Sequence, residues 1–374
     1  RSRTRQKFKY LKYVPFCIYS GPGDATEDGV SGDCQNFENW IGPYSRDSAS
    51  KECYKGVLNG EGDPDPVADM QKRMNLVKKA FDVAEKKGST NHETLNVFML
   101  PEFFFRSVRG AYLAKDMINA TDAHPIKKYL LDPMERMAAE NPNWLFVFGT
   151  IIAYDVVDGK THVNNFSPVI HRNYKLMVCK KHVSTIDFVD EDKNPKMVPN
   201  PTRHEKRGEK KMYKEGDIEG PHKFAERMGY QTATNLFCFH GIKFGLDICL
   251  DHAYGMTKSR TNNPQGKYAG DGSVSEAGGP VDVHLISSAG MSINLNEVAT
   301  SAQRGIVLLC DGEDGIFDCR YNGGHDKLTP ELTNLTPKTL KSKDYSDLFG
   351  ISSYTKKDFP IDAPSIAEYQ VIQI

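Results

Sequence analysis

The chain has 374 residues and a formal net charge of −1, with 39% hydrophobic and 26% charged residues. This length is enough for one large domain or two ordinary ones, with a sizeable buried core. A net charge near zero gives no field that would attract nucleic acid or an anionic membrane, and no apolar run approaches the ~20 residues of a membrane-spanning helix. We therefore expect a soluble globular protein without nucleic-acid or membrane partners.

The eight cysteines do not indicate a disulfide framework. There is no Cys-x-x-Cys pair and no Cys/His cluster at zinc spacing. Cys34 and Cys53 lie in a polar segment, and whether they pair is left open. The first residue is Arg rather than Met, so we expect the natural start to be missing. The compartment stays unknown, and cysteine usage only weakly favours the cytoplasm.

The first part of the chain predicts a strand, a loop, a helix and a second strand. A short apolar run predicts a strand over residues 13–19, and the Gly-, Asp- and Ser-rich stretch 20–64 predicts a long loop. From Pro66 to Lys87, apolar residues recur at steps of three and four, which is typical of an amphipathic helix. The apolar run 94–100 predicts the next strand.

The middle of the chain predicts a helix, a strand, a hairpin and a long insertion. Helical periodicity recurs around residues 125–139, and the apolar run 145–153 predicts one strand. Residues 163–171 and 175–182 predict a hairpin. The highly charged, proline-containing segment 184–220 is interpreted as an insertion.

The last part of the chain returns to strands. Residues 221–231 predict a link with a short helix, and the Gly-, Ser- and Asn-rich stretch 256–280 predicts a second long loop. Strands are predicted over residues 235–240, 242–248, 283–288, 305–310 and 369–374, with room for a helix between the third and the fourth. The alternation of strands and helices indicates the α/β class. We expect one large domain over residues 1–320, on which a C-terminal extension, 321–374, packs.

Three predicted strands end on side chains of complementary chemistry. Glu102 follows one strand, Cys249 ends the alternating apolar run 242–248, and the pair Lys180-Lys181 ends another strand. A carboxylate can accept the proton of a thiol, and an ammonium group favours the thiolate and stabilises negative charge on a substrate. Together they predict a nucleophilic acyl-transfer site.

Two of these residues have simpler interpretations when taken alone. A cysteine in an apolar strand, such as Cys249, is most often a buried core residue, and a strand-end glutamate is most often a surface carboxylate. However, Glu102 is followed by the aromatic run Phe103 to Phe105, and a carboxylate flanked by aromatic rings loses water, which suits a base.

The period-two alternation of a strand separates the two lysines. Leu176, Val178 and Lys180 fall on one face, so Lys180 is predicted to enter the site and Lys181 to be a solvated surface charge. Asn165, near the start of a predicted strand, is interpreted as a residue that fixes the edge of the sheet.

Four segments in chain order resemble motifs of the nitrilase (carbon–nitrogen hydrolase) superfamily. They are Leu100-Pro-Glu102, Lys180-Lys-His-Val183, Glu209-Lys-Lys-Met-Tyr-Lys-Glu-Gly-Asp217 and Gly245-Leu-Asp-Ile-Cys-Leu-Asp251. The resemblance covers residues 10–320 and implies a four-layer αββα sandwich. It also implies a catalytic triad of Glu102, Lys180 and Cys249, supported by Glu209, without a metal or an organic cofactor.

The resemblance further implies hydrolysis of a non-peptide carbon–nitrogen bond in a small-molecule amide or nitrile, through a thioester on Cys249. The backbone N–H of Leu250 would help Lys180 to stabilise the oxyanion. The candidate pocket residues are Phe103, Phe105, His252 and Tyr254. The family also implies a homo-oligomer. Where the family usually has an Arg after the Asp that follows the nucleophile, this chain has His252. The segments 184–208 and 256–280 are also longer than usual, and we expect these two segments to border the pocket and to set a different substrate specificity.

Three alternatives remain. The same triad would serve a nitrilase, or an acyltransferase that passes the acyl group to an amine. The fold would otherwise be a catalytically idle binding or assembly scaffold, against which the intact Glu102, Lys180 and Cys249 argue. A papain-like protease that uses Cys249 and a histidine is disfavoured, because the sequence around Cys249 is typical of a strand rather than the start of a helix.

Overall fold

The computed structural model describes most of the sheets, the helices and the turns between them. The described residues are 8–18, 20, 65–106, 111–114, 120–157, 160–182, 222–263, 268–274, 278–301, 305–312, 317–322, 333–339 and 365–374. The predicted loop 20–64 apart from its first residue, the insertion 184–220 with Glu209, and the pair Cys34 and Cys53 lie outside the described residues.

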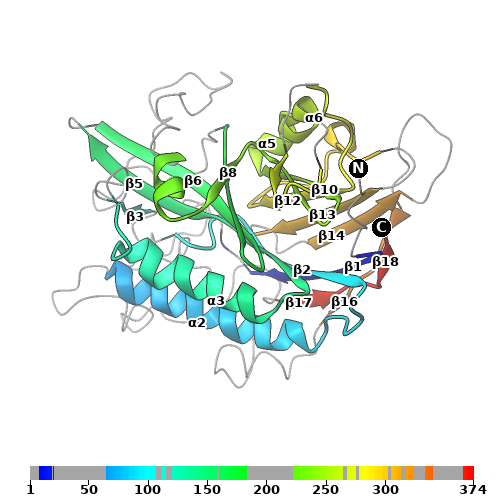
Figure 1. Cartoon of the computed structure of the whole chain (residues 1–374), viewed down its shortest axis with the longest axis horizontal. Helices are drawn as coiled ribbons and strands as arrows, with labels where there is room; N and C mark the ends of the chain where they lie inside the picture. Colours follow the sequence, from blue (N-terminus) through cyan, green and yellow to red (C-terminus); the bar gives the residue numbers. More distant parts are fainter. Residues whose placement is uncertain are drawn as a thin grey trace, which may run out of the picture.

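The first sheet joins strands from both ends of the chain (Figure 1). Its hydrogen-bonded order is β16-β17-β1-β2-β4-β6-β5-β3, and β18 pairs with β1, β7 with β6 and β8 with β7. These strands are β1 (Tyr10–Cys17), β2 (Thr94–Leu100), β3 (Tyr112–Leu113), β4 (Trp144–Phe148), β5 (Ile151–Val157), β6 (Lys160–His171), β7 (Tyr174–Cys179), β8 (Gln231–Ala233), β16 (Lys338–Thr339), β17 (Ser365–Glu368) and β18 (Ile372–Gln373). β1, β2 and β4 are parallel, and β6 is antiparallel to β4, β5 and β7.

The second sheet is formed by the second half of the chain. Its order is β11-β9-β10-β12-β13-β14-β15. These strands are β9 (Leu236–Phe239), β10 (Ile242–Ile248), β11 (Ala269–Gly270), β12 (Val283–Ser288), β13 (Gly305–Asp311), β14 (Phe317–Asn322) and β15 (Thr333–Asn334). At its centre β10, β12 and β13 are parallel, so the ends of β10 and β12 meet at one edge.

The two sheets pack face to face through a continuous apolar core. Val97 and Met99 of β2 belong to the same buried cluster as Leu246 of β10 and Leu285 of β12. Their neighbours along β2, such as Phe98, belong to a different cluster on the other face of the first sheet. This division follows from the alternation of side chains along a strand, and it explains why the strand is apolar at every position.

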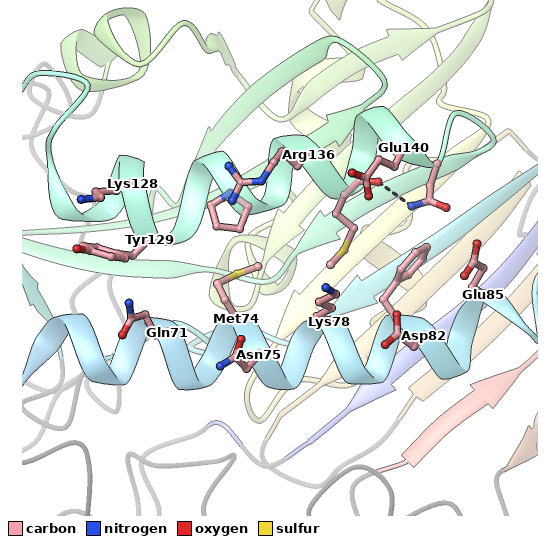
Figure 2. A pocket seen from close by; sticks show the side chains of 14 residues that line it. Gln71, Met74, Asn75, Lys78, Asp82, Glu85, Lys128, Tyr129, Arg136 and Glu140 are labelled. Carbon is pink, nitrogen blue, oxygen red and sulfur yellow. Dashed lines mark hydrogen bonds between the residues drawn. The ribbon is translucent and has the colours of Figure 1, made fainter.

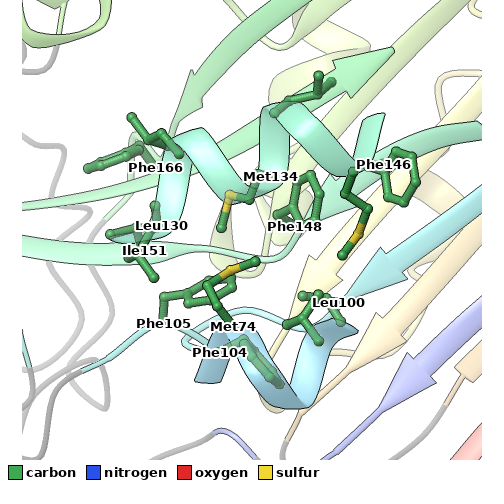
Figure 3. Close-up of a cluster of buried hydrophobic side chains, with 14 of the residues drawn as sticks. Met74, Leu100, Phe104, Phe105, Leu130, Met134, Phe146, Phe148, Ile151 and Phe166 are labelled. Atoms are coloured by element: carbon green, nitrogen blue, oxygen red, sulfur yellow. The ribbon is translucent and has the colours of Figure 1, made fainter. Parts of the chain in front are cut away.

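Helices cover the outer face of the first sheet. They are α2 (Pro66–Glu85), the π-helix η2 (Lys127–Leu131) and α3 (Asp132–Glu140). Helix α2 begins at Pro66 because Asp65 caps it, accepting hydrogen bonds from the backbone N–H groups of Val67 and Ala68. Figure 3 shows Met74 of α2 and Met134 of α3 in the cluster beneath the helices, together with aromatic side chains that include Phe146 and Phe148.

Shorter helices cover the outer face of the second sheet. They are α5 (Leu250–Ala253), α6 (Met256–Thr261) and the 3-10 helix η3 (Leu295–Glu297). A Cβ added to Gly245 of β10 would lie 2.2 Å from the Thr257 side chain, so α6 packs directly on the sheet. In Figure 1, α2 and α3 lie on one side of the sheets and α5 and α6 on the other. The layers are helix, sheet, sheet and helix, which confirms the predicted α/β class and αββα sandwich.

Both predicted hairpins are confirmed by antiparallel pairing of β6 with β7 and of β9 with β10. The second hairpin turns at His240 and Gly241, which have φ values of 52° and 84°. Two adjacent residues with positive φ are typical of the type I′ turn that matches the twist of the strands. Among the described helices, none is long and apolar enough to cross a membrane.

Three predicted elements are corrected by the structure. Residues 145–153 are not one strand but most of β4 and the start of β5, because the chain turns between β4 and β5 at Gly149, with φ 60°. The stretch 256–280 is not a continuous loop, because it begins with α6 and contributes β11 to the second sheet. The strand predicted over residues 369–374 is reduced to β18 (Ile372–Gln373), and a further strand that was not predicted, β17 (Ser365–Glu368), precedes it; both pair with β1.

Candidate active site

Glu102 and Lys180 extend from the same edge of the first sheet. β2 is parallel to β4, and β6 is antiparallel to both β4 and β7, so β2 and β7 run in the same direction. Glu102 lies two residues beyond the end of β2, and Lys180 directly follows β7. Strands that run in one direction deliver their C-terminal residues to one edge, and this is why two residues far apart in sequence meet.

The two side chains form a fully buried ion pair. Lys180 Nζ lies 2.8 Å from Glu102 Oε1, and both side chains have no exposed surface. Asn165 Nδ2 donates a second hydrogen bond of 2.8 Å to the same oxygen, and Asn165 O accepts from the backbone N–H of Lys180 at 2.9 Å. A buried ion pair must be offset by such bonds, because removing two charges from water costs several kcal/mol per ion.

Asn165 therefore has a larger role than the sequence suggested. It lies within β6, between β5 and β7, and not at the start of the strand. Its side chain holds the Glu102 carboxylate while its backbone holds the strand end that carries Lys180. A polar residue near the start of a predicted strand was interpreted as an edge position, and only the tertiary contacts assign it this role.

The turn after β2 presents Glu102 through a strained backbone. Phe103 has φ 63°, and its backbone N–H donates to Thr150 Oγ1 at 2.8 Å. Its ring lies 5.6 Å from Lys180 Nζ and 4.5 Å from the guanidinium carbon of Arg106. A positive φ at an aromatic residue is uncommon and persists only where the surroundings hold it. Phe103 thus contacts the ion pair directly.

Phe105 lies elsewhere. It is buried in the apolar cluster between the first sheet and the helices, and it forms a β-bridge with Ile151. The segment is also held from the helix side, because Arg73 Nη1 of α2 donates to Phe104 O at 2.6 Å. The structure brings Phe103 to the ion pair, but it places Phe105 in the core.

Cys249 occupies a strained turn between β10 and α5. Its backbone has φ 47° and ψ −110°, and its side chain is 4% exposed. Its N–H donates to Ser287 O at 2.9 Å, and its Sγ lies 3.8 Å from Ala289 O. A non-glycine residue in such a region costs about 1–3 kcal/mol, and strain of this kind gathers at functional sites. A sharp strand-to-helix turn is a known way to present a nucleophile.

The same turn corrects one argument made from the sequence. The residues before Cys249 do form strand β10, but helix α5 begins immediately after it at Leu250. Cys249 therefore does stand at the start of a helix, although α5 is only four residues long. A strand-like sequence is not a reason to reject a papain-like arrangement. However, the sequence has no Cys-Gly-x-Cys segment of the kind found around the nucleophile of papain-like proteases, and this argues against that arrangement.

The end of β12 joins the segments that carry Cys249 and Glu102. Ser287 accepts the Cys249 N–H through its carbonyl and donates from its Oγ to Leu100 O at 3.1 Å. The next residue, Ser288, accepts the Glu102 N–H at 3.3 Å. Because Ser287 and Ser288 bind one segment from each sheet, the thiol turn and the carboxylate turn are fixed side by side.

His252 is a buried member of a hydrogen-bond network and not an exposed pocket residue. Asp247 Oδ2 lies 3.2 Å from His252 Nδ1 and 2.9 Å from His284 Nε2, and Asp247 Oδ1 accepts two bonds from Thr257. The other ring nitrogens accept backbone N–H groups, His252 Nε2 from Asn294 and His284 Nδ1 from Ala299. Both histidines are therefore neutral and donate to the carboxylate.

This network contains residue types that bind metal ions, and its ligand atoms lie within 4.8 Å of one another. A metal-bound neutral histidine carries its proton on the other ring nitrogen and donates it outward. In this structure the outer nitrogens of His252 and His284 accept hydrogen bonds, so metal binding would require two imidazolate anions. The donor set fits a hydrogen-bonded carboxylate and does not fit a metal centre.

Four further residues were considered in the sequence analysis: Tyr254, Lys181, Leu250 and Glu209. Tyr254 is 39% exposed, and its ring lies 4.4 Å from that of His182. Lys181 is half-buried, and its backbone N–H donates to Asp251. Leu250 is the first residue of α5, where the N–H has no acceptor within the helix. Glu209 lies outside the described residues.

A groove on the helical face lies away from these strand ends. It has a volume of about 730 Å³ and runs between α2 and the helices η2 and α3. Figure 2 shows that its lining is largely polar, with Lys78 and Asp82 from α2 and Arg136 and Glu140 from α3. None of the predicted site residues lines it.

Comparison with known proteins gives structural similarities only. No family model and no curated protein matches the chain. Nit3 of Saccharomyces cerevisiae, from branch 10 of the nitrilase superfamily, is 11% identical, with 100% of this chain and 93% of that chain covered and a TM-score of 0.37. A mutant of the Nesterenkonia AN1 amidase, also of the nitrilase superfamily, is 9% identical, with coverages of 87% and 90% and a TM-score of 0.38.

A third similarity is to a larger protein. The glutamine-dependent NAD(+) synthetase of Cytophaga hutchinsonii is 10% identical, with 83% of this chain covered and a TM-score of 0.30, and this chain spans 39% of its length. All three TM-scores are below 0.5. The sheets and the contacts at the strand ends therefore carry the functional assignment.

Proposed function

We propose that the chain is a thiol-dependent hydrolase of a non-peptide carbon–nitrogen bond, acting on a small amide. The observation that carries this proposal is the buried Glu102–Lys180 pair, fixed through Ser287 and Ser288 beside the strained Cys249 turn. A base, a cation and a thiol are the groups that covalent acyl transfer requires. The motifs that resemble the nitrilase superfamily assign the same three residues.

In the first half of the proposed reaction, Glu102 accepts the proton of the Cys249 thiol and the thiolate attacks the amide carbon. The carbon–oxygen double bond becomes an oxyanion, which the Lys180 ammonium group and the Leu250 N–H stabilise. The carbon–nitrogen bond then breaks, and the leaving amine takes the proton held by Glu102. This leaves an acyl thioester on Cys249 and a carboxylate at Glu102.

In the second half, a water molecule gives a proton to Glu102 and attacks the thioester carbon. The carbon–sulfur bond breaks, the acid departs, and the proton returns from Glu102 to the thiolate of Cys249. Glu209, from the family resemblance, would orient Lys180 and the substrate nitrogen. A nitrilase or an amide acyltransferase would use the same thioester chemistry and would differ in the bond attacked or in the acceptor.

The first prediction tests the covalent intermediate. Intact-protein mass spectrometry after incubation with a library of small amides should show an acyl adduct that maps to Cys249. Cys249→Ala should lose the adduct and about 10³-fold or more of the turnover, because the nucleophile is removed. Cys319→Ala is the matched control. Cys319 is another buried cysteine, but it lies on β14 in the core between the sheets, where burial raises the pKa of its thiol.

Two outcomes of this experiment are decisive. An adduct that persists in Cys249→Ala, or that maps to another residue, would refute the assignment of the nucleophile. An adduct lost equally in Cys319→Ala would show that the loss reflects a damaged fold and not a missing nucleophile. An ordinary small amine added as an acceptor then separates transfer from hydrolysis, because an acyltransferase forms the new amide in preference to the acid.

A further inference from the structure

Asp251 makes a set of directed contacts between the two sheets that the proposed reaction does not use. Its Oδ1 accepts from the backbone N–H of His182 at 2.8 Å and lies 2.8 Å from His182 Nδ1. Its Oδ2 accepts from the backbone N–H of Lys181 at 3.0 Å. Asp251 belongs to α5 behind Cys249, whereas Lys181 and His182 directly follow Lys180.

These contacts fix the position of the strand end that carries Lys180 relative to the second sheet. Apolar packing holds the two sheets together, but it is non-directional and does not fix the strand ends at hydrogen-bond precision. The Ser287 and Ser288 contacts join the second sheet to the Glu102 segment. Asp251 joins it to the Lys180 segment, with three charge-assisted hydrogen bonds to one buried carboxylate.

We propose that Asp251 is a positioning residue that holds the Lys180 ammonium group in register with the Cys249 thiol. This inference rests on the proposed function, because it assumes that Lys180 acts on the chemistry of Cys249. Loss of the Asp251 carboxylate releases the backbone of Lys181 and His182, so the strand end that carries Lys180 shifts away from the thiol turn. The ammonium group then stabilises the thiolate less.

The second prediction follows, and it needs no substrate. The rate of Cys249 alkylation by iodoacetamide, measured by peptide mass spectrometry as a function of pH, reports the fraction of thiolate. Asp251→Ala should shift the midpoint of this profile upward by about one pH unit, because a neighbouring cation favours the charged form by that order. Asp251→Asn keeps one oxygen acceptor for the backbone N–H groups and should shift it by less than half as much.

A double-mutant cycle separates positioning from general damage. Lys180→Ala alone should shift the midpoint upward, and Asp251→Ala added to it should produce no further upward shift, because Asp251 raises the thiolate fraction only through Lys180. Asp271→Ala is the matched control. Asp271 also accepts backbone N–H groups, from His240 and Ser273, but it does so at the β9–β10 turn and it should leave the profile unchanged.

The results that would overturn the proposal are distinct from those that would refute the hydrolase. Additive shifts in the double mutant, or an unchanged profile in Asp251→Ala with a folded circular dichroism spectrum, would show that Asp251 does not act through Lys180. If Asp251→Ala fails to fold, the same cycle is run with Asp251→Asn. If no acyl adduct forms but the alkylation shifts in the double-mutant cycle are non-additive, the proposed amidase is refuted. The positioning role of Asp251 is then kept.

Discussion

At the scale of single residues, two adjacent lysines have opposite environments. Lys180 follows Leu176 and Val178 in the alternation of β7, both of which belong to the core between the sheets, and its ammonium group is paired with Glu102. Lys181 is half-buried and contributes its backbone N–H to Asp251. The chemical identity of the two side chains is the same, so only their direction from the strand decides which one can act on a substrate.

The third prediction uses this pair. Lys180→Ala should lower kcat/KM by at least about 10²-fold, because one oxyanion donor is worth roughly 3 kcal/mol. Lys181→Ala keeps its backbone N–H and should change turnover and melting temperature only slightly. Steady-state kinetics on the amide found by adduct screening would measure both. A larger loss in Lys181→Ala than in Lys180→Ala would contradict the assignment of the lysine.

At the scale of elements, the turns between strands decide where the site residues stand. Gly149 lies in the turn between β4 and β5, with φ 60°, and a Cβ placed there would lie 2.1 Å from Pro101 O. Pro101 is the residue before Glu102. The turn after β4 therefore packs directly against the backbone that presents the carboxylate, and only glycine allows this approach.

The fourth prediction compares two glycines. Gly241→Ala meets no atom within 4 Å, so its effect is limited to the strain of φ 84°, about 1 kcal/mol of unfolding free energy. Gly149→Ala adds a clash with Pro101 and should cost more stability and also at least about 10-fold in turnover, because Glu102 must move. Urea unfolding and kinetics measure the two effects. Equal stability losses with unchanged turnover in both variants would refute the role of Gly149.

At the scale of the whole molecule, a buried polar network joins the second sheet to its outer layer. Asp247 of β10 contacts Thr257 of α6, His252 of α5 and His284 of β12. Burial lowers the pKa of His284. Burial opposes ionisation of Asp247, but the two histidines outweigh it and leave the pKa of Asp247 below its usual value. Burial raises the pKa of Asp251.

These shifts give stability a predictable dependence on pH. Below about pH 6.5, His284 binds a proton more readily in the unfolded chain than in the folded protein, so acidification lowers the free energy of unfolding. Below about pH 4 the carboxylate of Asp247 lowers it further, because it is protonated more readily in the unfolded chain. The effect of Asp251 on the free energy of unfolding has the opposite sign. Because its pKa is raised in the folded protein, the folded state binds more protons than the unfolded chain above about pH 4, and acidification in that range stabilises the fold. The network of Asp247 and His284 therefore makes the folded protein more stable at neutral pH than at mildly acidic pH.

The fifth prediction isolates the His284 contribution. The unfolding free energy of the wild type should fall between about pH 7 and pH 5, and His284→Gln should be less stable at neutral pH but should show a flatter fall. Glutamine keeps an N–H donor for Asp247 without titrating. Urea unfolding across this range gives both slopes. An identical slope in the two proteins would show that another group controls the acid sensitivity.

The sequence by itself determined the features that depend on neighbouring residues. The helix from Pro66, the strand 94–100 and both hairpins follow from local periodicity and turn chemistry, and the structure places them within a few residues of the predicted ranges. The alternation of side chains along the strand also predicted that Lys180, and not Lys181, enters the site. The ordered motifs named Glu102, Lys180 and Cys249 as one set, although they could not say that Glu102 and Lys180 form a buried ion pair.

Only the tertiary structure decided the contacts between segments that are far apart in the chain. The bond from Asn165 to Glu102 and the contacts of Asp251 with Lys181 and His182 span 63 to 70 residues. The split of 145–153 also depends on a distant neighbour, Pro101, against which Gly149 packs. Local patterns carry no information about which strand ends become neighbours, because that is set by the pairing order of the sheets and by the way one sheet packs on the other.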